Sequence, residues 1–161
     1  MSHAIPARPQ TFFERSHIAI VASRYNLEYV DAMLDAARDE VQTVAPNTTI
    51  AVYRVPGAFE IPVTVEKVLR TSEPDAVIAL GVIIRGETEH GDLVGASVTD
   101  ALQSIAVSHC VPVIHEVLLV ASEEQAEERC LGEEINRGTE AARTAVTMAS
   151  LFKKMSIAQQ A

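Results

Sequence analysis

The sequence feature that most constrains the fold is a run of apolar residues from Asp75 to Ile83, which ends in a polar turn. The run has strand length and no polar alternation, a pattern typical of a strand buried on both faces of a parallel sheet. After His90, apolar residues recur every three or four positions, which predicts a helix over about 92–109. The turn Arg85–Gly91 then lies at the carboxyl edge of the sheet, where open α/β sheets bind ligands.

The rest of the chain repeats this alternation of strand and helix. We expect further strands at 17–22, 49–55 and 111–120. Helices are expected over about 30–41, 59–68 and 136–154, with a short one that Ser122 caps and Gly132 ends. The segment 59–68 has a mixed period, and we interpret it as helix because a strand there would leave no crossover to the next parallel strand. The pattern predicts a three-layer α/β/α sandwich with a four-stranded parallel sheet.

The 161 residues fit one domain, which we place at 14–155 between an arm at 1–13 and a tail at 156–161. The arm carries Pro6 and Pro9 and no periodicity, so in a monomer it would be disordered, and its ordering would need a neighbouring subunit. The composition, 48% hydrophobic but only 4% aromatic, also suggests apolar surface covered by other subunits.

The net charge of −9 argues against a nucleic-acid partner, which would need a basic face. No apolar run approaches a membrane span and no signal peptide is visible, so we expect a cytoplasmic protein without a membrane partner. The two cysteines, Cys110 and Cys130, lie at no metal-ligand spacing and beside helical apolar residues. We expect both to be reduced packing residues, and we expect no metal.

If the strand order is 2-1-3-4, the loops 23–26, 55–60 and 85–90 converge on one crevice. Tyr25 and Phe59 would offer aromatic stacking there, although an isolated loop tyrosine is more often a surface or capping residue. Glu60 could be a favourable first-turn charge only; the preceding Gly57, which lets a ligand approach the backbone closely, favours a binding role.

His90 is a candidate general acid/base, because an imidazole titrates near neutral pH and this one follows a strand end. The alternative is a solvated loop histidine. Gly86, Thr88 and the following helix N-terminus could form an anion site, and the absence of a Lys-Ser/Thr pair there rules out a Walker loop. Arg129 is either one end of a surface ion-pair ladder or a phosphate ligand supplied to a neighbouring subunit.

Three blocks of sequence together resemble the 6,7-dimethyl-8-ribityllumazine synthase family. They are Val55-Pro56-Gly57-Ala58-Phe59-Glu60-Ile61-Pro62, the stretch 81–90, and 124–129 followed by Asn136-Arg137-Gly138. The resemblance covers about 17–152 and implies a flavodoxin-like sheet of order 2-1-3-4. The family is a transferase of riboflavin biosynthesis that condenses 5-amino-6-(D-ribitylamino)uracil with 3,4-dihydroxy-2-butanone 4-phosphate, releases phosphate and water, and uses no cofactor.

The resemblance also implies roles for individual residues. His90 would move protons, and Arg129 would bind the substrate phosphate and stabilise the charge that develops on it. The residues expected to bind substrate are Tyr25, Asn26, Gly57, Ala58, Phe59, Glu60, Val82, Ile83, Ile84, Gly86, Glu87, Thr88, His115, Arg129 and Arg137. The phosphate would lie at Gly86, Glu87 and Thr88, and His115 would come from the adjacent subunit.

The chain departs from the family's usual residues at Tyr25, Gly91 and His115, and the segment 131–134 lacks a lysine often found there. The family implies a homo-oligomer of at least five chains and leaves a decamer or a sixty-subunit capsid open, although Glu133 and Glu134 would add like charge where pentamers meet. Two rival functions remain on the same scaffold. One is a flavin- or lumazine-binding protein that has lost catalysis, and the other is a shell whose enclosed space matters more than turnover.

Overall fold

The computed structural model describes residues 6–132 and 135–158, so Glu133, Glu134 and the outer ends of the expected arm and tail lie outside the described residues. Its sheet has four parallel strands in the order β2-β1-β3-β4, which confirms the expected topology. The strands are β1 (Ser16–Ser23), β2 (Thr48–Val55), β3 (Ala76–Ile84) and β4 (Val113–Val120). Each lies within a few residues of its expected position.

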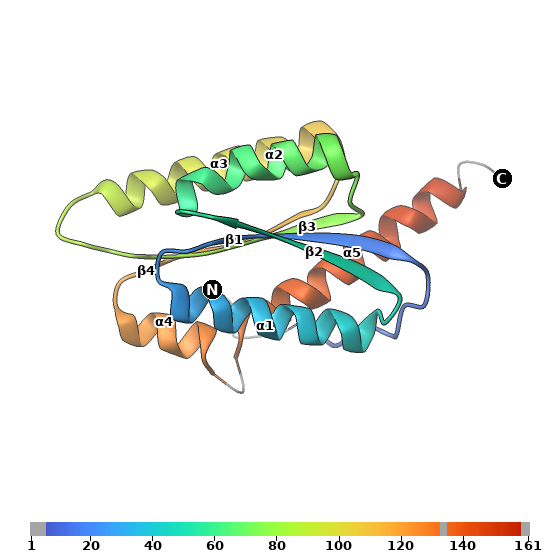
Figure 1. Cartoon of the computed structure of the whole chain (residues 1–161), viewed down its shortest axis with the longest axis horizontal. Helices are drawn as coiled ribbons and strands as arrows, with labels where there is room; N and C mark the ends of the chain where they lie inside the picture. The colour runs from blue at the N-terminus through green and yellow to red at the C-terminus, as the bar shows by residue number, and fades with distance from the viewer. Residues whose placement is uncertain (1–5, 133–134, 159–161) are drawn as a thin grey trace.

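Helices cover both faces of this sheet (Figure 1). One face carries α1 (Leu27–Val44), α4 (Glu123–Cys130) and α5 (Arg137–Ala158), and the other carries α2 (Ile61–Ser72) and α3 (His90–His109). The helix expected over 59–68 is confirmed as α2, preceded by a single 3₁₀ turn at Ala58–Glu60. The helix expected to end near residue 154 continues instead to Ala158, because the two lysines at 153 and 154 allow helix to continue.

The two sides of the sheet bury separate apolar clusters because alternate strand residues point to opposite faces. On β1, Ile18 and Ile20 pack towards α1 and α5, whereas Ala19 and Val21 pack towards α2 and α3. The central strand β3 is buried over most of its length, as its continuous apolar run predicts. The sheet therefore holds the loops at its carboxyl edge on a rigid base.

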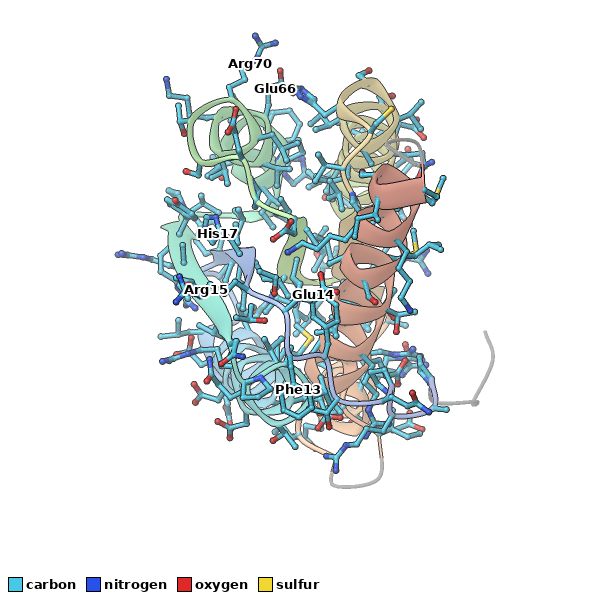
Figure 2. All side chains as sticks on the ribbon, turned by 90° about the vertical axis from the view of Figure 1, so that its right-hand side faces the viewer. Phe13, Glu14, Arg15, His17, Glu66 and Arg70 are labelled. Atoms are coloured by element: carbon cyan, nitrogen blue, oxygen red, sulfur yellow. The ribbon has the colours of Figure 1, made fainter. Side chains whose placement is uncertain are left out.

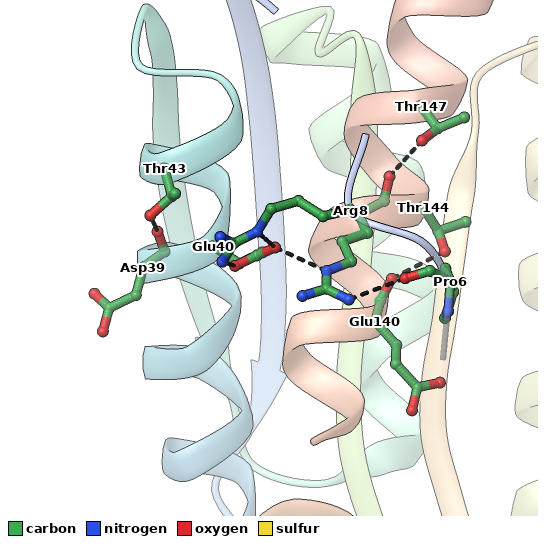
Figure 3. A network of polar contacts seen from close by, with 9 residues as sticks. Pro6, Arg8, Asp39, Glu40, Thr43, Glu140, Thr144 and Thr147 are labelled. Carbon is green, nitrogen blue, oxygen red and sulfur yellow. Dashed lines mark hydrogen bonds and ion pairs between the residues drawn. The ribbon is translucent and has the colours of Figure 1, made fainter. Parts of the chain in front are cut away.

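The described part of the arm contacts its own chain (Figure 3). Arg8 donates two hydrogen bonds to the carboxylate of Glu40 on α1, and Arg143 on α5 donates to the same carboxylate and to the carbonyl of Pro6. The backbone N–H of Phe12 donates to the carbonyl of Val44. Within residues 6–13, Pro6, Arg8 and Phe12 therefore have hydrogen-bond partners in their own chain, which the expectation of an arm ordered by a neighbouring subunit did not include. Sequence periodicity does not report such long-range polar contacts.

The chain enters β1 at the amino-terminal edge of the sheet, which faces the viewer in Figure 2 with Phe13, Arg15 and His17 labelled. Cys130 is buried as expected, but Cys110 is exposed, because it caps α3 in a left-handed conformation that turns it away from the core. Both cysteines are free. Within the described residues, no helix combines the length and apolar character that a membrane crossing requires.

Candidate functional site

A cavity of about 750 Å³ opens at the carboxyl edge of the sheet, within the range typical of small-molecule sites. Its walls come from the loops after β1, β2 and β3 and from the first turns of α3. The lining residues are Tyr25, Asn26, Gly57, Ala58, Phe59, Glu60, Val82, Ile83, Ile84, His90, Gly91, Leu93, Val94 and Ser97. The sequence prediction brought the first ten of these together but omitted the last four, which the helical period after His90 could have indicated.

The loop after β1 is fixed by Asn26. This residue has φ 54° and ψ 48°, a left-handed conformation that asparagine tolerates better than most residues. Its side-chain amide donates to the carbonyl of Val82 at 2.8 Å, which ties the loop to β3. The ring of Tyr25 lies against Gly57, where a Cβ atom would be 2.9 Å from Cδ2. Gly57 therefore makes room for the ring.

Both aromatic side chains at this edge are open to solvent. Tyr25 is 69% exposed and Phe59 is 61% exposed. Burial of such large rings would stabilise the fold, so leaving them in water forgoes that stabilisation. Since each ring also lines the cavity, each offers a face to a planar ligand.

Glu60 lies at the end of the 3₁₀ turn, one residue before α2, rather than inside a helix as the sequence suggested. Its Oε2 accepts a hydrogen bond from the N–H of Gly57 at 2.9 Å. That bond fixes the carboxylate at the cavity wall, where it can accept hydrogen bonds from a polyol or an amine.

His90 is the first residue of α3, not a loop residue, and its exposed side chain lines the cavity. The helix begins two residues before its expected start, because the carbonyl of Glu89 already accepts a bond from the N–H of Leu93. The preceding loop residues Gly86, Glu87 and Thr88 are exposed and lie outside the cavity lining. Gly86 has no positive φ, and a Cβ atom there would meet nothing within 4 Å, so the fold of the single chain does not require glycine.

A second cavity, of about 360 Å³, follows the edge strand β4 and the helices beside it. It contains the other predicted residues, His115, Arg129 and Arg137, and shares no lining residue with the first. The buried Nε atoms of Arg129 and Arg137 have no hydrogen-bond partner among the described residues. Arginines that line a cavity and keep unsatisfied guanidinium N–H groups are suited to bind an anion.

Both ring nitrogens of His115 are engaged. Nδ1 accepts from the N–H of Val117 at 3.1 Å, and Nε2 lies 2.8 Å from the hydroxyl of Thr99, which donates to the carbonyl of Gly95. An accepting Nδ1 requires the neutral ring, with its proton on Nε2. Burial also lowers the pKa of His115. This side chain can therefore offer a neutral ring face but no free nitrogen.

Glu116, beside His115 on β4, is a residue that the sequence prediction missed. Burial raises the pKa of its carboxyl to about 7; the positive charge of Arg137 opposes this rise and the negative charge of Glu140 adds to it. A carboxylate inside the apolar segment 111–120 was the signal that could have identified it. No group of three or more His, Cys, Asp or Glu in the described ranges is placed to hold a metal ion.

A parallel α/β sandwich with an apolar, aromatic-walled cavity at its carboxyl edge defines a small-molecule protein of the flavodoxin-like class. The family model described as 6,7-dimethyl-8-ribityllumazine synthase matches residues 15–153. The chain belongs to the 6,7-dimethyl-8-ribityllumazine synthase family.

Curated relatives of this chain carry the same name, 6,7-dimethyl-8-ribityllumazine synthase. The relative from Halorhodospira halophila is 38% identical over 141 residues, 87% of this chain and 90% of that protein. The one from Chlorobium limicola is 39% identical over 137 residues, 84% of this chain and 88% of the relative. The one from Pyrococcus furiosus is 38% identical over 142 residues, 88% of each chain. The similarity thus covers most of the length of this chain and of each relative.

Proposed function

We propose that this chain catalyses the 6,7-dimethyl-8-ribityllumazine synthase reaction of riboflavin biosynthesis. It is a transferase that condenses 5-amino-6-(D-ribitylamino)uracil with 3,4-dihydroxy-2-butanone 4-phosphate and releases phosphate and water, without a cofactor. Besides the family relationship, the main structural support for this reaction is the first cavity, which combines two solvent-exposed aromatic rings, a fixed carboxylate and a histidine.

In this proposal the first cavity holds the pyrimidine and its ribityl chain. Tyr25 stacks on the heterocycle, and Val82, Ile83 and Ile84 form the apolar wall. The ribityl hydroxyls bind at Asn26, at the backbone of Gly57, Ala58 and Phe59, and at Glu60. His90 moves protons during imine formation, phosphate elimination and ring closure.

The substrate phosphate binds where a second subunit completes the site. Gly86, Glu87 and Thr88 contribute from the first chain, and Arg129, Arg137 and the ring of His115 contribute from the neighbour. Two observations support a shared site: most of the predicted residues divide between two cavities, and Gly86, which lines neither, is open to close approach from outside its own chain. Elimination increases the negative charge on the phosphate, which guanidinium groups stabilise.

A shared site requires a homo-oligomer, for which we propose a pentameric ring in the cytoplasm as the smallest assembly. Exposed apolar side chains at Phe13, Leu93, Val107 and Met155 support such contacts. The ring could also pair into a decamer or close into a sixty-subunit capsid. Light scattering at low and high salt distinguishes these assemblies by mass. A monomeric mass with full activity would contradict the shared site.

The reaction is tested by mixing the two substrates and following product absorbance. An enzyme forms product at a rate proportional to the concentration of active sites. A lumazine-binding protein that has lost catalysis binds the product but does not form it, so equilibrium binding with no turnover would favour that rival. A shell with negligible turnover would assemble normally but fail the same assay.

A further inference from the structure

Glu116 faces the same side of the sheet as the two arginines of the second cavity. Along β4, Ile114, Leu118 and Val120 pack into the apolar cluster beneath α1, α4 and α5, whereas Val113 and Val117 pack towards α2 and α3. Because strand residues alternate between faces, Glu116 points with the first group, towards α4 and α5. His115 points the other way, towards Thr99 on α3.

The groups around Glu116 nearly balance in charge. Helix α4 supplies Arg129 and Cys130, and α5 supplies Arg137 and Glu140. Burial raises the pKa of the Cys130 thiol to about 12, so it is neutral. The neighbouring strand β3 carries no titratable side chain.

Among the described residues, the protonation state of Glu116 decides the sign of this balance. Glu140 neutralises Arg137 through an ion pair of 2.6 Å, and Glu128, which lies 3.3 Å from Arg129, is 57% exposed and screened by solvent. With Glu116 ionised, the four groups Glu116, Arg129, Arg137 and Glu140 carry two positive and two negative charges. With Glu116 protonated, one positive charge remains, and the cavity becomes an anion site.

We propose that Glu116 is the proton-linked gate of the anion site formed by Arg129 and Arg137, so that an anion enters when Glu116 is neutral. This inference rests on the proposed function, because it concerns the site assigned to the substrate phosphate. The linked step is balanced: the Glu116 carboxylate takes up one proton from solvent as one anion binds. A neutral carboxyl can also donate a hydrogen bond to an anion, which a carboxylate cannot do.

The physical reason for the linkage is the competition between two negative charges for the same guanidinium groups. An anion beside an ionised Glu116 would meet a like charge in a partly dehydrated cavity, which is unfavourable. Since burial already places the pKa of Glu116 near 7, the change of state falls in the physiological range. Anion affinity should therefore fall as the pH rises.

The test uses inorganic sulfate, which keeps its charge between pH 6 and pH 8 where phosphate would itself titrate. Sulfate binding to the intact assembly is measured by calorimetry at both values for the wild type and for Glu116→Gln. The wild-type Kd should rise about tenfold from pH 6 to pH 8, the ratio expected when a group of pKa near 7 must be protonated. Glu116→Gln should bind sulfate with a nearly constant Kd, because an amide at this position has no proton to take up or release in this pH range.

Three measurements decide the result. A wild-type Kd that does not change with pH, or an equal change in Glu116→Gln, overturns the gate. Loss of binding in Arg129→Ala, with mass and circular dichroism unchanged, locates the sulfate at this cavity, and unchanged binding there overturns the assignment. Product formation is measured on the same samples: activity without pH-linked sulfate binding refutes the gate alone, whereas absence of activity refutes the proposed function.

Discussion

The backbone of Gly138 on α5 lies so close to Met33 on α1 that a Cβ atom at residue 138 would be 1.9 Å from the Met33 carbonyl oxygen. A side chain at this position cannot be accommodated by moving another side chain, because the obstacle is backbone. Glycine therefore sets the distance at which the two helices pack.

We expect Gly138→Ala to destabilise the fold by about 3 kcal/mol, since α1 and α5 must separate to admit the methyl group. Thermal unfolding at a fixed protein concentration measures the effect. Gly95→Ala on α3 is the matched control, because a Cβ there would come no closer than 3.4 Å to the side chain of Leu119, an ordinary contact, and should not lower the melting temperature. Equal melting temperatures for both variants would show that the helices do not depend on this contact.

The Glu40 carboxylate, 7% exposed, should stabilise the fold in a pH-dependent manner. Hydrogen bonds from Arg8 and then Arg143 outweigh burial and lower its pKa, so its contribution is complete above about pH 4.5 and is lost as the pH falls towards the lowered pKa. Glu40→Gln should cost roughly 1–3 kcal/mol at pH 7 and much less at pH 3. Asp39→Asn, on the exposed side of the same helix, should show no such difference (Figure 3).

His90→Asn should slow turnover by about a hundredfold or less, while substrate binding stays near normal. The effect is limited because the substrates already carry a reactive amine and ketone, so orientation supplies much of the rate. Steady-state kcat measures the turnover, and equilibrium binding of the ribityl substrate measures the affinity. His17→Asn, at the opposite edge of the sheet (Figure 2), is the control. A wild-type kcat for His90→Asn would refute the proton-transfer role.

Arg129→Ala should weaken binding of the butanone phosphate by about 2–3 kcal/mol and spare the ribityl substrate, because only the phosphate loses a charge-assisted pair. The KM of each substrate, measured with the other saturating, separates the two. Arg70→Ala removes an arginine from α2 at the far edge of the sheet and should change neither constant (Figure 2). An equal loss for both substrates would indicate a disrupted interface instead.

The strands were predictable from the sequence because burial on two faces leaves a direct composition signal, clearest at β3. The loops of the first cavity were also predictable, because parallel strands place their carboxyl ends, and the loops that follow them, at one edge of the sheet. Contacts between distant residues were not predictable. The pairing of Arg8 with Glu40 and the position of Arg129 and Arg137 beside Glu116 depend on how helices pack, which periodicity does not encode.

The division of the predicted site residues between two cavities has a genetic consequence. In a ring of head-to-tail contacts, each site would combine the first cavity of one chain with the second cavity of the next. A chain carrying His90→Asn keeps a normal second cavity, and a chain carrying Arg129→Ala keeps a normal first one. When both are co-expressed, about a quarter of the interfaces in a randomly mixed ring should unite two intact halves. Two defective alleles would then complement each other within one cell, and mixed rings would outperform either pure variant.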